Sequence, residues 1–320
     1  MRKIVRFVIL FIVATTMCSC TFRGEDVKAK VEETTPTNPT ELVAVSPTPP
    51  PVTTDWGEDE NGIYYIERNN RVYGWKDINE KTYYFNEDGY MHTGWLEKTD
   101  KKYYFNEDGS MAKGIVTIDG KDYHFASNGE YVIVVNPWNY IPDDYDTNLV
   151  RLSSAIGTTG SQGNAVCVED LEEMIMDANQ YSGAKVYVVS SYRNYNTQKS
   201  NFNNKVKYYQ SRGYSYDDAY KTAATIIAIP NTSEHQLGLA FDIIDTRDWS
   251  LEERQENYAG QQWLMENCWK YGFILRYPKD TIDVTGIIYE PWHYRYVGKF
   301  VAKEIHDTGL TLEEYFASLS

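Results

Sequence analysis

The chain has 320 residues, of which 31 are Lys or Arg and 46 are Asp or Glu, so its formal net charge is −15. This acidic balance argues against a nucleic-acid-binding protein, which needs a basic surface. Four cysteines are too few for a disulfide framework, and the length allows two folded domains.

Residues 1–20 have the pattern of an export signal. Basic residues precede an apolar run at 7–14 that is too short to span a bilayer. The next residues, Met17-Cys18-Ser19-Cys20, resemble the lipobox of bacterial lipoproteins. This resemblance implies cleavage before Cys20, a lipid on that cysteine, and a protein held at the outer face of the cytoplasmic membrane. An ordinary secretory signal is the alternative, and either interpretation predicts export.

Residues 21–56 are rich in Pro and Thr, including Ser46-Pro47-Thr48-Pro49-Pro50-Pro51. Such a composition buries too little apolar surface to fold, and its prolines favour an extended chain. We therefore expect a disordered linker that separates the membrane from the folded part.

Residues 57–133 contain an internal repeat of 20 residues, marked by Gly74, Gly94 and Gly114. The segment Tyr-Tyr-Phe-Asn-Glu-Asp-Gly occurs at 83–89 and again at 103–109. An aromatic strand followed by an Asp-Gly turn and a second short strand is typical of a β-hairpin. Because a single hairpin is only marginally stable, we expect an all-β solenoid of stacked hairpins.

These units resemble the cell-wall-binding repeats of choline-binding and glucan-binding surface proteins. In choline binders a Trp before the Tyr pair completes an aromatic cage, and here that position holds Thr82, Lys102 or Asp122. We therefore expect contact with wall glycan or teichoic acid, through Trp75 and Trp95 as the best candidates. The alternative is that the aromatic residues only form the core of a spacer.

Residues 134–320 mix helical and strand patterns without regular alternation, which predicts an α+β domain. In chain order we expect a helix at 170–178, a strand at 186–189, two helices within 197–227 separated near Gly213, a buried strand at 239–244, and a helix at 263–271 that ends at Gly272.

Two histidines in this region lie in dense polar and aromatic clusters, namely His235 and His293. Asp242 lies within an apolar strand, where a carboxylate is costly unless it is paired or bound to a metal. Gly238 permits a turn that would bring His235 over Asp242, and a tight turn at Pro291 would place Glu290 on the same side as His293. Three protein ligands with a free fourth position are the pattern of catalytic zinc, with Glu290 beside the bound water.

The two clusters match Ser-x-His-x-x-Gly-x-Ala-x-Asp and Glu-Pro-Trp-His-Tyr-Arg without a gap. They resemble the VanY-type zinc D-alanyl-D-alanine carboxypeptidases and the related L,D-carboxypeptidases. The resemblance implies a hedgehog/VanY-like fold over 134–320. It also implies zinc held by the family's ligands and a glutamate as the catalytic base. The ligands map onto His235, Asp242 and His293, and the base maps onto Glu290. The stretch Tyr-Arg-x-x-x-x-Gln resembles the family's substrate-binding element and maps onto Arg193 and Gln198. Ser233 is a further candidate, which either contacts substrate or caps a turn.

This resemblance implies removal of the C-terminal D-Ala from peptidoglycan stem peptides. Cleavage of a pentapeptide and of a tetrapeptide are both compatible, the second being an L,D-carboxypeptidase activity. A serine D,D-peptidase is a weaker alternative, because Ser182 and Lys185 fit Ser-x-x-Lys but the Lys-Thr-Gly strand is missing. A wall-binding protein without catalysis is disfavoured by the intact His, Asp and Glu set. Cys167 and Cys268 are expected in the core, where their pairing stays open.

Overall fold

The computed structural model describes residues 51–99 and 101–320. The predicted export signal, the lipidation candidate Cys20 and most of the predicted linker lie outside the described residues. Among the helices that the structure describes, none is both long enough and apolar enough to cross a membrane.

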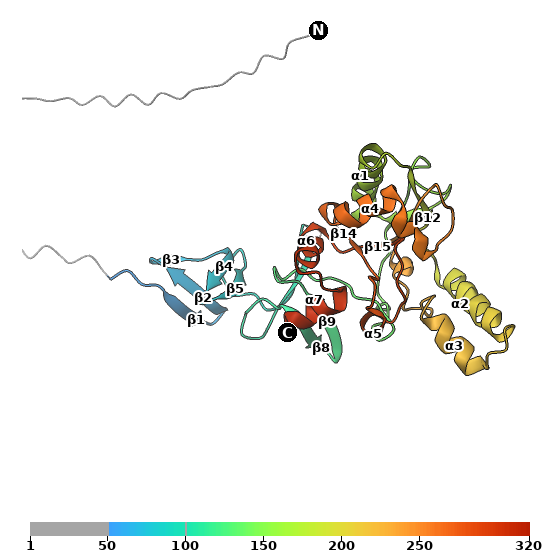
Figure 1. Ribbon diagram of the computed structural model, residues 1–320. Helices are drawn as coiled ribbons and strands as arrows, with labels where there is room; N and C mark the ends of the chain where they lie inside the picture. Colours follow the sequence, from blue (N-terminus) through green and yellow to red (C-terminus); the bar gives the residue numbers. More distant parts are fainter. Residues whose placement is uncertain (1–50, 100) are drawn as a thin grey trace, which may run out of the picture. The chain divides into compact units, whose positions relative to one another are not determined.

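The repeats form a succession of short antiparallel hairpins (Figure 1). The glycine that begins each later unit starts one strand, and the Tyr-Tyr-Phe run forms its partner, so that Trp75 lies opposite Tyr84 and Trp95 opposite Tyr104. The strands are β1 (Asp55–Asp59), β2 (Gly62–Glu67), β3 (Asn70–Arg71), β4 (Gly74–Ile78), β5 (Lys81–Phe85), β6 (Gly94–Lys98), β7 (Lys101–Phe105), β8 (Gly114–Ile118) and β9 (Lys121–Phe125).

The turn that joins paired strands differs from the one that the sequence predicts. In the unit β4–β5 the hairpin turn is at Asn79 and Glu80, whose φ values are 49° and 66°. Positive φ at both positions is typical of a two-residue hairpin turn, whose twist matches that of the flanking strands. The Asn-Glu-Asp-Gly turn leads only to a single bridge between Phe85 and Met91. The main partner of each aromatic strand therefore precedes it in the chain.

Aromatic rings join each hairpin to the next. The Trp75 ring lies 5.3 Å from the ring of Tyr84 in its own hairpin and 4.9 Å from that of Tyr103 in the following one. Phe85, Phe105 and Phe125 are fully buried between the units. Because the apolar face of one hairpin is covered by its neighbour, stacking supplies the stability that a single hairpin lacks.

The remaining residues form a mixed helical and sheet region, which confirms the predicted α+β class behind an all-β hairpin region. A four-stranded antiparallel sheet has the order β12-β13-β15-β14. Its strands are β12 (Val186–Ser190), β13 (Ala240–Asp245), β14 (Phe273–Leu275) and β15 (His293–Tyr296), and a separate pair is β10 (Leu149–Arg151) and β11 (Gln162–Asn164).

The expected helices are present, but the one expected at 263–271 is divided between the end of an α-helix and a 3₁₀ helix. The structure describes seven α-helices. They are α1 (Ala165–Tyr181), α2 (Tyr195–Gln210), α3 (Tyr216–Ala224), α4 (Ala259–Asn267), α5 (Ile282–Thr285), α6 (Lys299–Thr308) and α7 (Leu312–Ser318), with 3₁₀ helices η1 (Glu234–Leu237), η2 (Glu253–Asn257) and η3 (Cys268–Tyr271). The break between α2 and α3 contains Gly213, and η3 ends at Gly272, as the sequence predicts.

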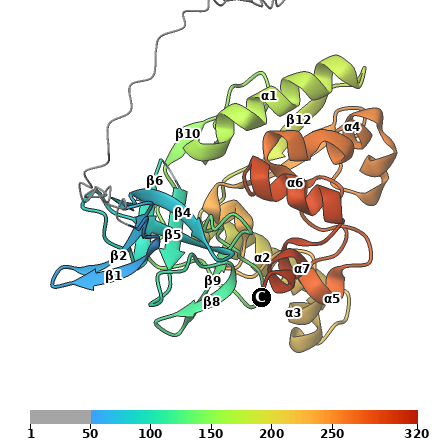
Figure 2. The same cartoon turned by 90° about the vertical axis from the view of Figure 1, so that its left-hand side faces the viewer.

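One face of the sheet packs on α1 and α4, which contact each other (Figure 2). The buried side of α1 includes Leu171 and Ile175, and it shares a core with Phe241 and Ile243 of β13. Because side chains alternate along a strand, Asp242 points to the opposite face. Cys167 and Cys268 are buried free thiols in this core.

The last hairpin and the C-terminal helices are in contact. The hydroxyl of Ser127, after β9, donates to Glu304 of α6 over 2.7 Å, and the His124 ring lies 5.2 Å from that of Phe316 in α7. At Gly114 a side chain would come within 2.7 Å of the Leu319 carbonyl oxygen. Residues on the two sides of the boundary predicted at 133/134 therefore pack together, and that boundary stays a prediction.

Candidate metal centre and active site

A left-handed glycine places His235 over the strand that carries Asp242. His235 lies in η1, which ends at Gly238 with φ 71°, and the chain then reverses into β13. A side chain at 238 would come within 2.9 Å of the Asn164 amide nitrogen, so glycine is required here both for its conformation and for space. The result is a separation of 3.3 Å between His235 Nε2 and Asp242 Oδ1.

Strand pairing brings the second histidine to the same place. β13 and β15 pair so that Asp242 lies directly opposite His293, with His293 Nδ1 3.2 Å from Asp242 Oδ1. The two imidazole rings are nearly perpendicular, with centroids 4.9 Å apart. One ligand atom from each of His235, Asp242 and His293 lies within 4.8 Å of the others, which makes this a buried group able to hold a metal ion.

Glu290 reaches the site through a tight turn. The His293 amide donates to the Glu290 carbonyl over 3.2 Å, and this turn places Glu290 Oε2 3.5 Å from His293 Nδ1. Burial raises the pKa of the Glu290 carboxyl to about 8. A carboxyl group that takes up and releases a proton near neutral pH suits general acid–base catalysis.

The protein's own charges act differently on the two histidines. Burial, together with the Arg193 cation, lowers the pKa of His235 to about 4. Burial opposes charge on His293 as well, but its contacts with Asp242 and Glu234 raise its pKa to about 9. The pKa of Asp242 is held well below its usual value, against the effect of burial, by the two histidines.

The donor set fits a divalent cation. Asp242 Oδ1 is buried and makes no hydrogen bond within the described part of the chain, although an imidazole nitrogen lies on each side of it within 3.3 Å. A buried carboxylate oxygen without a partner is costly, and a cation shared with the two imidazoles would satisfy it. Two imidazoles and one carboxylate oxygen are ligands that zinc accepts.

Of the three residues predicted to bind substrate, Arg193 and Ser233 lie close to this centre. Arg193 follows β12, and its amide donates to the His235 carbonyl over 3.1 Å, whereas its Nε is buried without a hydrogen-bond partner among the described residues. Gln198 in α2 is buried and donates through Nε2 to the Ala228 carbonyl. Ser233 is buried and directly precedes η1, two residues before His235.

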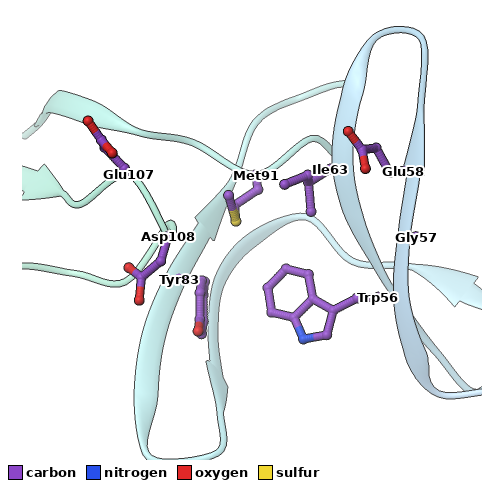
Figure 3. Close-up of a pocket in the computed structure, with 8 residues that line it drawn as sticks. All are labelled: Trp56, Gly57, Glu58, Ile63, Tyr83, Met91, Glu107 and Asp108. Atoms are coloured by element: carbon purple, nitrogen blue, oxygen red, sulfur yellow. The ribbon is translucent and has the colours of Figure 1, made fainter.

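The predicted wall-binding tryptophans are far along the chain from this centre. Trp75 and Trp95 keep 43% and 40% of their surface exposed, so each ring is shared between the hairpin core and solvent. Sequence reasoning missed a third, equivalent residue. Trp56 of β1 lies 5.0 Å from the ring of Tyr83, and these two residues help to line a pocket of about 460 Å³ (Figure 3).

Two further contacts at the metal centre were not predicted from the sequence. The Ser191 carbonyl lies 2.8 Å from His235 Nδ1, and the buried Glu234 carboxylate lies 3.4 Å from His293 Nε2. Backbone carbonyls carry no signal in the sequence. Glu234 could have been noticed only as an acidic residue inside the cluster that contains His235.

The serine-peptidase alternative is not supported by the position of its nucleophile. Ser182 follows α1, where its hydroxyl donates to the Ala178 carbonyl over 2.6 Å. That residue therefore caps a helix. Together, the α+β fold and the two histidines, aspartate and glutamate define a site of the metal-dependent hydrolase class.

Comparisons with known proteins agree with this class. Residues 161–299 match the family described as VanY, D-alanyl-D-alanine carboxypeptidase, and residues 72–114 and 97–136 match choline-binding repeats. A D-alanyl-D-alanine carboxypeptidase of Enterococcus faecalis (strain ATCC 700802 / V583) is 40% identical over 184 residues, which are 58% of this chain and 65% of that protein. The chain thus spans slightly less than two thirds of this curated relative.

Two solved structures are similar over nearly their whole length. A glutamate-to-alanine mutant of the vancomycin-resistance D,D-pentapeptidase VanY, in complex with Zn(II), is 40% identical with a TM-score of 0.51 and covers 57% of this chain and 97% of its own. The LdcB LD-carboxypeptidase is 34% identical with a TM-score of 0.53 and covers 65% of this chain and 95% of its own. The chain belongs to the VanY family of D-alanyl-D-alanine carboxypeptidases.

Proposed function

We propose that this protein is a zinc carboxypeptidase that removes the C-terminal D-Ala from peptidoglycan stem peptides. The observation that carries the proposal is the buried group of His235, Asp242 and His293 with Glu290 beside it. Membership of the VanY family and the Zn(II) in the solved VanY structure support zinc as the metal. His235, Asp242 and His293 would hold the ion, which when bound polarises the scissile carbonyl and acidifies water toward a pKa of about 7.

The protein's own groups account for the proton transfers. Glu290 takes the proton of the attacking water and delivers it to the nitrogen of the departing D-Ala. Its place on the turn before β15 fixes its carboxylate next to His293, so one rigid segment carries a ligand and the base. The buried surroundings exclude bulk water and strengthen the electrostatic interactions at the reacting bond.

Arg193 provides the recognition of a chain end. A carboxypeptidase has to distinguish a free C-terminal carboxylate from a peptide bond, and a guanidinium does so by charge-assisted hydrogen bonds. The unpaired, buried Nε of Arg193 is a donor that a substrate carboxylate would satisfy. Gln198 and Ser233, both buried, are assigned as further substrate contacts from the resemblance alone.

Replacing Arg193 with methionine is expected to lower kcat/KM for a stem pentapeptide by roughly 10- to 150-fold, because a hydrogen bond to a charged group contributes about 1.5–3 kcal/mol. The loss should fall mainly on KM. Kinetics on the pentapeptide and on its C-terminal amide provide the matched comparison. Wild type should strongly prefer the free acid and Arg193→Met should not. An unchanged preference in the variant would assign carboxylate recognition to another residue.

Pentapeptide is the preferred substrate in this proposal, because the D,D-pentapeptidase is the more similar of the two solved proteins in sequence, at 40% against 34% identity. The likeness to an LD-carboxypeptidase makes the tetrapeptide the second candidate. Mass spectrometry of purified muropeptides after incubation with the protein separates them. Loss of one D-Ala from the pentapeptide supports the first activity, and loss from the tetrapeptide supports the second. If neither product forms, the proposed function is wrong.

We assign the hairpin repeats to attachment of the protein to cell-wall glycan or teichoic acid. The match to choline-binding repeats and the half-exposed tryptophans support a binding role. In the pocket shown in Figure 3, Trp56 and Tyr83 are accompanied by the carboxylates of Glu58 and Asp108. An aromatic and acidic lining favours the cationic or hydroxyl-bearing groups of a wall polymer.

Substituting Trp75 and Trp95 together by alanine is expected to reduce retention of the full-length protein on purified cell walls. The physical reason is the loss of the exposed ring faces that a sugar or a cation would contact. Trp138→Ala is the matched control, since Trp138 is 62% exposed and lies outside the repeats. Equal retention of all three proteins would make the repeats a spacer.

Export follows from the substrate, because peptidoglycan lies outside the cytoplasmic membrane. We assign residues 1–20 to an export signal and Cys20 to a lipid anchor, on the lipobox-like sequence alone. Residues 21–56 would then separate the catalytic part from the membrane.

A further inference from the structure

A buried carboxylate lies behind the metal centre, on the side away from Asp242. Glu234 precedes His235 in η1, and its side chain is fully buried. A charge in such a position is costly unless it is paired and hydrogen-bonded. Its oxygen Oε1 accepts from Arg276 Nε over 2.7 Å and from an Arg295 guanidinium nitrogen over 2.8 Å.

The second oxygen of Glu234 has a different neighbour. Glu234 Oε2 lies 3.4 Å from His293 Nε2, slightly longer than the ~2.7–3.2 Å of a typical N–H···O hydrogen bond. A carboxylate accepts but does not donate, so the proton of the neutral imidazole belongs on Nε2. The lone pair of His293 is then on Nδ1, the atom that lies 3.2 Å from Asp242.

The other histidine is held in the corresponding way. His235 Nδ1 lies 2.8 Å from the Ser191 carbonyl, which can only accept, so the free lone pair of His235 is on Nε2. That nitrogen is the one 3.3 Å from Asp242. Each imidazole therefore has an acceptor behind it that fixes which nitrogen faces the metal group. For His293 this acceptor is a charged side chain.

The carboxylate is itself held in place by arginines. Arg276 also donates to Glu313 of α7 over 2.9 Å and 2.5 Å, and Arg295 donates to the Ile133 carbonyl over 2.6 Å. Arg276 and Arg295 are fully buried. The hydrogen bonds from these two buried arginines hold the Glu234 carboxylate beside His293. The two carboxylates and the two guanidiniums also balance in charge.

We propose that Glu234 is a positioning residue, which holds His293 in the tautomer and orientation that bind the metal and thereby sets metal affinity. The inference rests on the proposed function, because it concerns the zinc that this function requires. A carboxylate behind a metal-bound histidine makes the imidazole a better ligand, and its loss typically costs 10- to 100-fold in metal affinity.

The test measures zinc affinity of the full chain by competition with a chromophoric chelator, in the absence of substrate. Glu234→Gln should bind zinc roughly 10- to 100-fold more weakly than wild type. Its cobalt(II)-substituted form should show a shifted visible absorption spectrum. The matched control is Glu313→Gln, which removes the outer contact of Arg276 without touching His293. That variant should lose thermal stability while keeping the zinc affinity and the cobalt spectrum of wild type.

Because Glu234→Gln leaves two buried arginines short of a counter-charge, it could fail to fold. The double variant Glu234→Gln/Arg276→Gln keeps the charge balance. If the single variant does not fold, the double variant takes its place in the same measurements. Wild-type zinc affinity in the Glu234 variant, or an equal loss of affinity in Glu313→Gln, would overturn the proposal. Wild-type protein that binds no zinc would instead refute the proposed function itself.

Discussion

Replacing Glu290 with glutamine is expected to lower kcat on a stem pentapeptide by roughly 10²- to 10⁴-fold, the usual contribution of general acid–base catalysis. Glutamine has nearly the same shape but cannot take up the proton of the attacking water. Since Glu290 lies beside the metal group and is not one of its three members, zinc binding should persist. Steady-state kinetics and zinc content of the same preparation check both statements.

Glu256→Gln is a matched control for this experiment. Glu256 is a glutamate outside the metal group, and its carboxylate is bound by the Tyr289 hydroxyl and by the half-exposed Lys279. The control should keep a kcat close to wild type. A Glu290→Gln protein that cleaves as fast as wild type would show that another group accepts the proton.

Replacing Asp242 with asparagine is expected to abolish both zinc binding and activity. Asp242 is the member of the group that lies between the two imidazoles, and it supplies the only negative charge among the three ligands. The loss in affinity should exceed the roughly 10- to 100-fold that follows removal of an outer partner. Metal analysis after gel filtration, with activity measured on the same fractions, gives the comparison.

Thermal unfolding of Asp242→Asn separates loss of metal from loss of fold. Asp242 is paired with two buried histidines, so the metal-free variant should be less stable than metal-free wild type but should still unfold in one cooperative transition. The added stability that excess zinc gives to wild type should be missing. Full activity with stoichiometric zinc in Asp242→Asn would exclude Asp242 as a ligand.

Much of the metal centre could be predicted because its residues are close in the sequence. His235, Gly238 and Asp242 lie in one turn and one strand, where backbone rules relate their positions. The apolar run around Asp242 indicated a buried strand, and the structure gives β13 at Ala240–Asp245. Local spacing was sufficient for these features.

Other parts depend on contacts between distant segments, which the sequence does not encode locally. The register of β13 and β15, which sets Asp242 opposite His293, follows from the packing of the whole sheet. Glu234 looks like an ordinary surface glutamate until Arg276 and Arg295 are brought to it by folding. The hairpin turns were misplaced because Asn-Glu at 79–80 is a weaker turn signal than Asp-Gly at 88–89.

The most direct test of this account is to strip the purified wild-type protein of metal with a chelator and then titrate zinc back while following release of D-Ala from a stem pentapeptide. We expect activity to vanish on stripping and to return in proportion to zinc bound, with saturation at one ion per chain. Cleavage that continues at full rate in the stripped protein, or that zinc fails to restore while the fold is intact, would contradict a metal centre built from His235, Asp242 and His293.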